Sequence, residues 1–210
     1  MIVPLVEGDG DAAAVPVLLR RIIQAYYPDA LGIQVGRPLV AHGRTKLLGE
    51  YGKYLGYARA KGGQCRGLLV LLDADEDCPK DLAWELAGRA LACSLPYPLA
   101  VVVARCEYEA WLLASASEMK DRLPRADRVK VPADVEGVRN PKGLLTEMMG
   151  PGRAYKETID QARLSAELNL SLAEENCRSF RRLLSAMGCL LQAVRDGSTG
   201  VTPISPSSER

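Results

Sequence analysis

The sequence contains one histidine, His42, and none of its six cysteines lies in a CxxC pair. A zinc site of ordinary ligand spacing is therefore not expected. No run approaches the ~20 apolar residues that a membrane-spanning helix needs. Residues 1–7 lack the basic segment and long apolar core of a secretory signal. We therefore expect a cytoplasmic protein that does not contact a membrane.

A strong excess of charge of either sign is also missing: 27 Lys and Arg face 26 Asp and Glu, for a net charge of +1. Whole-chain electrostatics thus neither require nor exclude a polyanionic partner. A local excess does exist, because one acid, Glu50, accompanies seven basic residues between positions 37 and 66. Such a stretch can follow phosphates or form a solvated helix face. Its basic residues are Arg37, Arg44, Lys46, Lys53, Arg59, Lys61 and Arg66.

The most informative stretch is 68–79, where five aliphatic residues are followed at once by acids. The aliphatic run predicts a strand that is buried on both faces. Asp73 and Asp75 then stand at its carboxyl end, where ligands bind in open α/β sheets. Burying two unpaired carboxylates is costly. A divalent cation with hard oxygen ligands, Mg²⁺ or Mn²⁺, would compensate their charge.

Other segments repeat this alternation of strand and helix. Apolar runs predict strands at 2–6, 33–40, 68–72 and 99–104, and helical spacing predicts helices at 12–27, 46–61, 79–93 and from 106 onward. The alternation predicts an α/β fold with a parallel four-stranded sheet covered by helices on both faces. We assign residues 1–120 to this domain, 121–196 to a helical extension packed on it, and 197–210, rich in Ser, Pro and Gly, to a disordered tail.

Acidic residues follow three of the predicted strands. Glu7 follows the first strand, and it would face Asp73 and Asp75 if the first and third strands are neighbours. Such a set could hold one or two cations, which would polarise a phosphodiester and generate a hydroxide, while a free carboxylate moved a proton. Alternatives stay open: Asp77 could cap the following helix, and Glu107 or Glu109 could pair with Arg105 or a lysine. The candidate metal ligands are Glu7, Asp11, Asp73, Asp75, Asp77, Glu107 and Glu109.

The VEGDGD segment after the first strand, together with LDAD after the third, resembles the TOPRIM (topoisomerase–primase) fold. Three further features resemble the DUF4276 family of small TOPRIM-like bacterial and archaeal proteins, and the resemblance spans most of residues 1–185. They are VLLDADEDCP, YEAWLL, and a distal region with Tyr155-Lys156, Gln161 and Cys177-Arg178-Ser179-Phe180.

The resemblance implies a Mg²⁺- or Mn²⁺-dependent nuclease domain similar to that of OLD-family nucleases. Glu7 then matches the general acid/base, Asp73 and Asp75 match the metal ligands, and Glu107 or Glu109 matches the acid after the fourth strand. Lys142 or Lys156 is a candidate for a basic residue beyond the sheet. The resemblance also implies an ABC/AAA-type ATPase partner in anti-phage or mobile-element systems. That partner would be encoded separately, because this chain contains no ATPase motif.

Three hypotheses follow. The first is a nuclease of DNA or RNA in which basic residues around Arg44 and Lys46 steer the backbone and Lys142 or Lys156 assists. The second is a non-catalytic nucleic-acid-binding or regulatory subunit of an ATPase. The third is a phosphotransfer or small-nucleotide enzyme. Tyr155-Lys156 and three arginines, Arg178, Arg181 and Arg182, would face nucleic acid or form a solvated helix face. The sequence leaves open whether the chain forms a homodimer.

Overall fold

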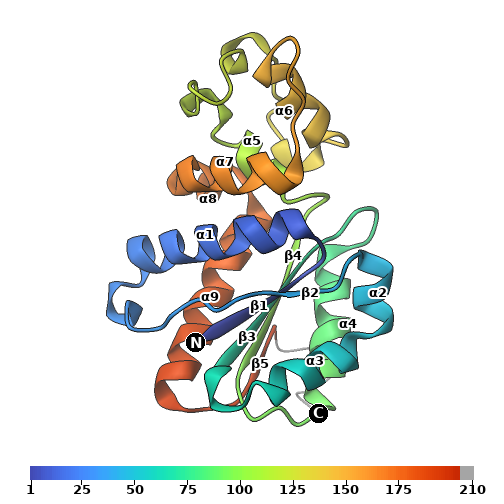
Figure 1. The fold of residues 1–210 in the computed structure, drawn as a ribbon, viewed down its shortest axis with the longest axis vertical. Helices are drawn as coiled ribbons and strands as arrows, with labels where there is room; N and C mark the ends of the chain where they lie inside the picture. Colours follow the sequence, from blue (N-terminus) through green and yellow to red (C-terminus); the bar gives the residue numbers. More distant parts are fainter. Residues whose placement is uncertain (204–210) are drawn as a thin grey trace.

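A computed structural model describes residues 1–203, and its centre is a parallel sheet of five strands in the order β2-β1-β3-β4-β5 (Figure 1). Every pairing between neighbouring strands is parallel, and β1 lies directly beside β3. The predicted parallel α/β sheet is therefore confirmed. The strands are β1 (Ile2–Val6), β2 (Leu39–Val40), β3 (Gly67–Asp73), β4 (Leu99–Ala104) and β5 (Val201–Thr202).

The expectation of four strands is wrong by one. The fifth strand, β5, has two residues, Val201 and Thr202, which pair with Leu99 and Ala100 of β4. It lies within the segment expected to be a disordered tail, and so short a pair among Ser, Gly and Pro residues carries no periodic signal. The expected disorder of the last residues, 204–210, concerns a segment that lies outside the described part of the chain.

Side chains of each strand alternate between two hydrophobic layers. The helices on the first face are α1 (Asp9–Tyr26) and α9 (Arg178–Asp196), and those on the second are α2 (Arg44–Gly49), α3 (Tyr51–Ala60) and α4 (Pro79–Leu91). Ile2, Val6, Leu69 and Leu71 pack on the first face with α1 and α9, whereas Val3, Leu5, Leu68 and Val70 pack on the second with α3 and α4. Burial on both faces explains why β3 and β4 are continuous apolar runs.

Two helix predictions differ from the structure in their boundaries. The helix expected at 46–61 is two helices, α2 and α3, which meet at Glu50, where φ is −107° and ψ is 19°. The first helix begins at Asp9 rather than at residue 12, so Asp11 lies in its first turn. This earlier start of the helix places the Asp11 carboxylate close enough to Glu7 for its charge to raise the pKa of Glu7.

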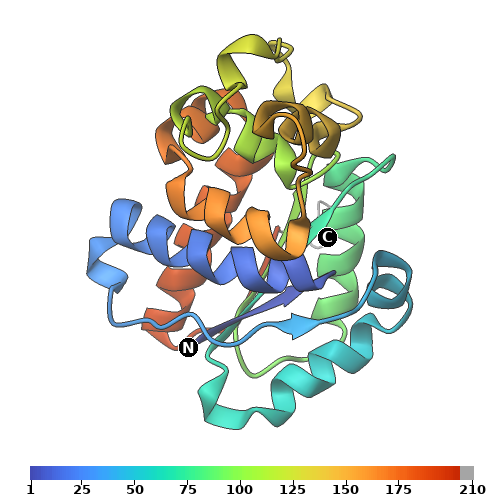
Figure 2. The same ribbon diagram turned by 45° about the horizontal axis from the view of Figure 1, so that its top comes forward.

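The segment between β4 and α9 forms a cap of short helices over one end of the sheet (Figures 1 and 2). It contains α5 (Glu109–Leu113), α6 (Pro141–Met149), α7 (Ala162–Glu167), α8 (Leu170–Asn176) and a π-helix, η6 (Glu157–Gln161). Contacts of α7 and η6 with α1 bring residues of the cap to the carboxyl ends of the strands. Single 3₁₀ turns are η1 (Pro28–Ala30), η2 (Gly62–Gln64), η3 (Ala116–Glu118), η4 (Ala126–Arg128) and η5 (Val135–Gly137).

Candidate acidic site at the carboxyl edge of the sheet

The strand order places a topological switch point between β1 and β3, because the chain leaves these neighbouring strands toward opposite edges of the sheet. Crevices at the carboxyl ends of such strands are the usual ligand sites of open α/β sheets. Glu7 directly follows β1, and Asp73 is the last residue of β3. The backbone N–H of Asp73 donates a 3.0 Å hydrogen bond to Glu7 Oε1. The expected meeting of these two residues is therefore present in the structure.

Asp11 brings a further carboxylate to the same place from the first turn of α1. Its Oδ2 accepts a hydrogen bond from the backbone N–H of Gly8 at 3.2 Å, and its Oδ1 accepts one from Gln161 Nε2 at 3.0 Å. Burial raises the pKa of Asp11 despite these two hydrogen bonds. Burial also raises the pKa of Glu7, and the nearby negative charges of Asp11 and Asp75 raise it further.

Asp73 lies at the centre of this group. Its Oδ1 accepts a hydrogen bond from the backbone N–H of Tyr108 at 2.9 Å. Burial raises its pKa well above the ordinary value, and the charges of Asp11, Glu109 and Glu7 add to the rise. These acids come from four different elements or their ends, so the topology brings them together. Close carboxylates that repel one another are typical of sites that bind a cation or share a proton.

Lys142, at the start of α6, supplies a positive charge to one side of the cluster. Its Nζ lies 2.9 Å from Glu107 Oε2 and 2.6 Å from Glu157 Oε1. Burial acts to lower the pKa of Lys142, but Glu109, Glu157 and Glu107 together raise it above its ordinary value. Lys142 therefore stays protonated. Of the two partners considered for Glu107, the structure shows the lysine, since Arg105 instead pairs with Asp134 at 3.2 Å.

Glu109 is almost fully buried, with 1% of its surface exposed. The hydroxyl of Tyr155 donates a 2.9 Å hydrogen bond to its Oε1. Burial raises the pKa of Glu109 to about 7, although Lys142 and Tyr155 both act to lower it. Glu109 thus changes its charge near neutral pH, which is unusual for a carboxylate.

Arg44 neutralises the exposed side of the acidic loop after β3. Its guanidinium forms ion pairs with Asp75, at 3.5 Å, and with Asp77, and donates a hydrogen bond to the backbone carbonyl of Asp73. Asp75 adopts a left-handed backbone conformation with φ of +50°. Lys46 and Lys156 are both exposed, and neither forms an ion pair within residues 1–203.

The described residues hold no group of three or more His, Cys, Asp and Glu side chains that is already arranged to bind a metal ion. The types of donor do fit a hard divalent cation, because Glu7, Asp11 and Asp73 are all carboxylates, and the charge of Asp11 raises the pKa of both Glu7 and Asp73. In addition, the buried Oε1 of Gln161 has no hydrogen-bond partner within residues 1–203. A cation would relieve the repulsion and satisfy unpaired oxygens.

Sequence reasoning gives neither Gln161 nor Tyr155 a role in the acidic site, although they bind Asp11 and Glu109 in the structure. Both belong to the distal motif of the resemblance, and that motif is the only signal that could have found them. Gln161 is 150 residues from Asp11, and no local pattern predicts such a contact.

The family model of DUF4276, a domain of unknown function, matches residues 6–188. That range includes every acidic residue of the cluster. No curated protein and no solved structure shows significant similarity to the chain. The match covers most of the sequence, from the end of β1 into α9, and so includes the sheet core as well as the cap. The chain therefore belongs to the DUF4276 family.

Proposed function

We propose that this protein is a Mg²⁺- or Mn²⁺-dependent nuclease with a TOPRIM-like domain, which hydrolyses phosphodiesters of DNA or RNA. The observation that carries the proposal is the convergence of Glu7, Asp11 and Asp73 at the switch point of a parallel sheet. Their raised pKa values favour binding of a cation, because a bound cation offsets the repulsion between their charges. The biological setting that we propose is a bacterial or archaeal defence or mobile-element system with a separate ATPase.

Each residue of the cluster has a part that follows from its contacts. Asp73 is held by the amide of Tyr108, which leaves its other oxygen available as a ligand. Glu7 is oriented by the amide of Asp73, and burial raises its pKa above that of an ordinary glutamate, which favours a role in proton transfer. Asp11 completes the group from α1. A bound Mg²⁺ would polarise a phosphoryl oxygen and lower the pKa of a water molecule.

Lysine side chains near the acids would guide the nucleic-acid backbone. Lys142 keeps its charge beside the cluster, because three glutamates surround it. Lys46 and Lys156 are exposed and free of ion pairs within the described residues, so their charges are available to phosphates. Arg44 is less available to phosphates than these lysines, because its guanidinium forms ion pairs with Asp75 and Asp77.

A cleavage assay tests this proposal. Purified protein is incubated with plasmid DNA and with single- and double-stranded DNA and RNA oligonucleotides, in Mg²⁺, Mn²⁺ or EDTA. Asp73→Asn and Glu7→Gln should each reduce metal-dependent cleavage at least about 100-fold. Glu76→Gln is the matched control, because Glu76 is an exposed acid of the same loop. Cleavage that survives in the double variant with EDTA present would refute the proposal.

A second candidate function has specific support. Arg44 and Lys142 already form ion pairs with four acids around Glu7, Asp11 and Asp73, which would help this region to be stable without a metal. The four acids are Asp75, Asp77, Glu107 and Glu157. The protein would then be a non-catalytic nucleic-acid-binding or regulatory subunit of an ATPase. Titration calorimetry with Mn²⁺ and gel-shift assays distinguish the two. Tight binding of nucleic acid with neither Mn²⁺ binding nor cleavage would favour this second candidate.

A further inference from the structure

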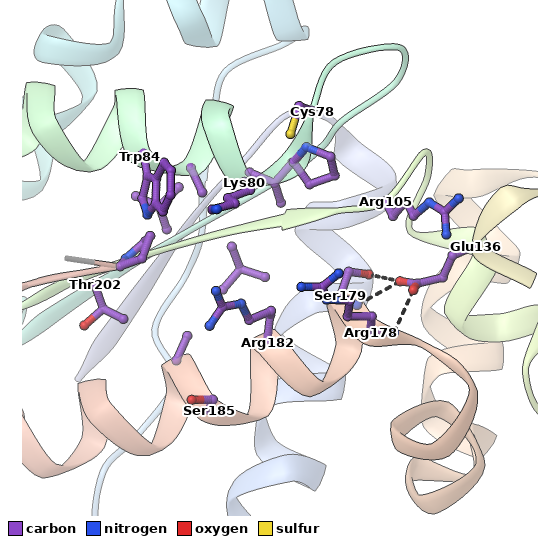
Figure 3. Close-up of a pocket in the computed structure, with 17 residues that line it drawn as sticks. Cys78, Lys80, Trp84, Arg105, Glu136, Arg178, Ser179, Arg182, Ser185 and Thr202 are labelled. Atoms are coloured by element: carbon purple, nitrogen blue, oxygen red, sulfur yellow. Dashed lines mark hydrogen bonds between the residues drawn. The ribbon is translucent and has the colours of Figure 1, made fainter. Parts of the chain in front are cut away.

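A cleft of about 380 Å³ lies between α4 and α9, beside the free edge of β4 (Figure 3). Its floor is apolar and includes Val101, Val102 and Val103 of β4. Cys78 and Pro79, which follow the acidic loop after β3, form part of its wall. Glu7, Asp11 and Asp73 are not among the residues that line the cleft, so it is separate from the acidic site, and residues 74–77 connect the two.

Positive side chains dominate the polar lining of this cleft. Lys80 comes from α4, Arg178 and Arg182 come from α9, and Arg105 follows β4 (Figure 3). Within residues 1–203, Lys80, Arg178 and Arg182 have no ion-pair partner, whereas Arg105 pairs with Asp134. Three unpaired cations around an apolar floor would attract an anion that carries an apolar group.

Among the described residues the lining has one carboxylate, Glu136, and its oxygens are already engaged in hydrogen bonds. It is 2% exposed, and it accepts hydrogen bonds from the backbone N–H groups of Arg178, at 2.6 Å, and Ser179, at 2.9 Å, and from the Ser179 hydroxyl. Figure 3 shows these bonds at the start of α9. Glu136 therefore caps α9, so the arginine side chains, rather than the amides of the helix, are free for a ligand.

Two further features favour a ligand with a planar group. Strand β5 pairs only with Leu99 and Ala100, so from Val101 onward the edge of β4 has no neighbouring strand among the described residues. Such an edge presents backbone donors and acceptors. Trp84 lines the same cleft, and the ammonium of Lys80 lies 4.2 Å from the centre of its ring. An indole beside a cation is a suitable surface for a nucleobase next to its phosphate.

We propose that this cleft binds a nucleoside phosphate. Lys80, Arg178 and Arg182 would hold the phosphate, and the base would lie against Trp84 and the edge of β4. The volume is within the usual range for small-ligand sites. A free mononucleotide and the terminal nucleotide of a strand offer the same chemistry. The site goes beyond the proposed nuclease activity, since binding there requires neither a metal nor cleavage.

Titration calorimetry of the full chain in EDTA tests the proposal. The probes are adenosine 5′-monophosphate, adenosine, inorganic phosphate, and a short oligonucleotide with or without a 5′-phosphate. The monophosphate should bind at least about tenfold more tightly than adenosine or phosphate, because the cleft offers both an apolar floor and cations. Affinity for the phosphorylated oligonucleotide well above that for the monophosphate would identify a strand end as the ligand, and equal affinity would identify the free nucleotide.

Variants locate the binding. Arg182→Gln and Lys80→Gln, on two different helices, should each weaken binding about tenfold through loss of a charged hydrogen bond. Arg195→Gln is the matched control, because Arg195 lies on α9 and does not line the cleft. Asp73→Asn should bind normally, which separates this site from the acidic cluster. The proposal is overturned if no nucleotide binds, if Arg182→Gln and Lys80→Gln bind as the wild type does, or if an acidic peptide binds more tightly than every nucleotide probe.

Discussion

Glu109 offers a quantitative test of the electrostatics of the site through the substitution Glu109→Gln. The glutamine keeps an oxygen that can accept the Tyr155 hydrogen bond, and it removes the charge. In the native protein the pKa of Glu109 rises from 4.5 to about 7, mainly because of burial. The folded protein therefore binds the proton more tightly than the unfolded chain between these two pH values.

The sign and size of the effect follow from this shift. Since the native state holds the extra proton, the free energy of unfolding falls as pH rises from about 4.5 to about 7. At about 1.4 kcal/mol per pKa unit, the loss at alkaline pH is about 3 kcal/mol. The charge of Glu109 also raises the pKa of Asp73. Replacing Glu109 with a neutral glutamine should therefore lower the pKa of Asp73 toward its ordinary value.

Urea denaturation in EDTA at several pH values measures the effect. Glu109→Gln should match the wild type near pH 4 and should be about 3 kcal/mol more stable near pH 8. Glu85→Gln is the control: Glu85 is exposed and pairs with Arg89 on α4, so its loss should change stability by less than about 1 kcal/mol. If Glu109→Gln is less stable than the wild type near pH 8, or if both proteins show the same pH dependence, Lys142 outweighs burial and the reasoning is refuted.

Three other substitutions test separate parts of the structure. Glu136→Ala removes the acceptor of three hydrogen bonds at the start of α9, and chemical denaturation should show a loss of about 2–4 kcal/mol; an unchanged midpoint would contradict that role. Gly10→Ala places a Cβ 2.5 Å from Gln161 Oε1 and 2.8 Å from Glu157 Cβ, so it should destabilise the protein by about 1–3 kcal/mol. The control is Gly52→Ala in α3, where a Cβ meets no described atom within 4 Å, and it should stabilise the protein by about 0.5–1 kcal/mol. Equal changes in stability at both positions would rule out the close packing of α1 on η6. Arg44→Gln removes the positive charge beside Asp75 and Asp77, which would otherwise repel a metal ion nearby. Calorimetry should therefore show that Mn²⁺ binds about tenfold more tightly to this variant, and weaker binding would contradict that repulsion.

The part of the site that lies on the sheet could be predicted from the sequence. Continuous apolar runs identify β3 and β4, and Asp73, the acid that ends the run of β3, marks the carboxyl edge of the sheet. Parallel neighbours then bring Glu7 and Asp73 together, as the 3.0 Å hydrogen bond between them confirms. These features depend on local pattern and on a few general rules of sheet topology.

The surroundings of the site could not be predicted in the same way. Lys142 and Tyr155 reach Glu107 and Glu109 from short helices and turns that have no clear periodicity. Arg44 was expected to face phosphates because it lies in a basic stretch, yet its guanidinium binds the acidic loop. Charge counted along the sequence does not reveal which partner the tertiary fold supplies. Strand β5 was missed because two residues are too few to form a pattern.

The central claim is that Glu7 and Asp73 bind a divalent cation, and a crystal soaked in Mn²⁺ tests it most directly. Diffraction data collected at the manganese absorption edge locate the ion without reference to any assumed site. The claim predicts an anomalous peak within bonding distance, about 2.0–2.3 Å, of carboxylate oxygens of both Glu7 and Asp73. The peak should disappear in Asp73→Asn crystals. No peak between these residues, or a guanidinium or ammonium group occupying the position at saturating Mn²⁺, would contradict the claim.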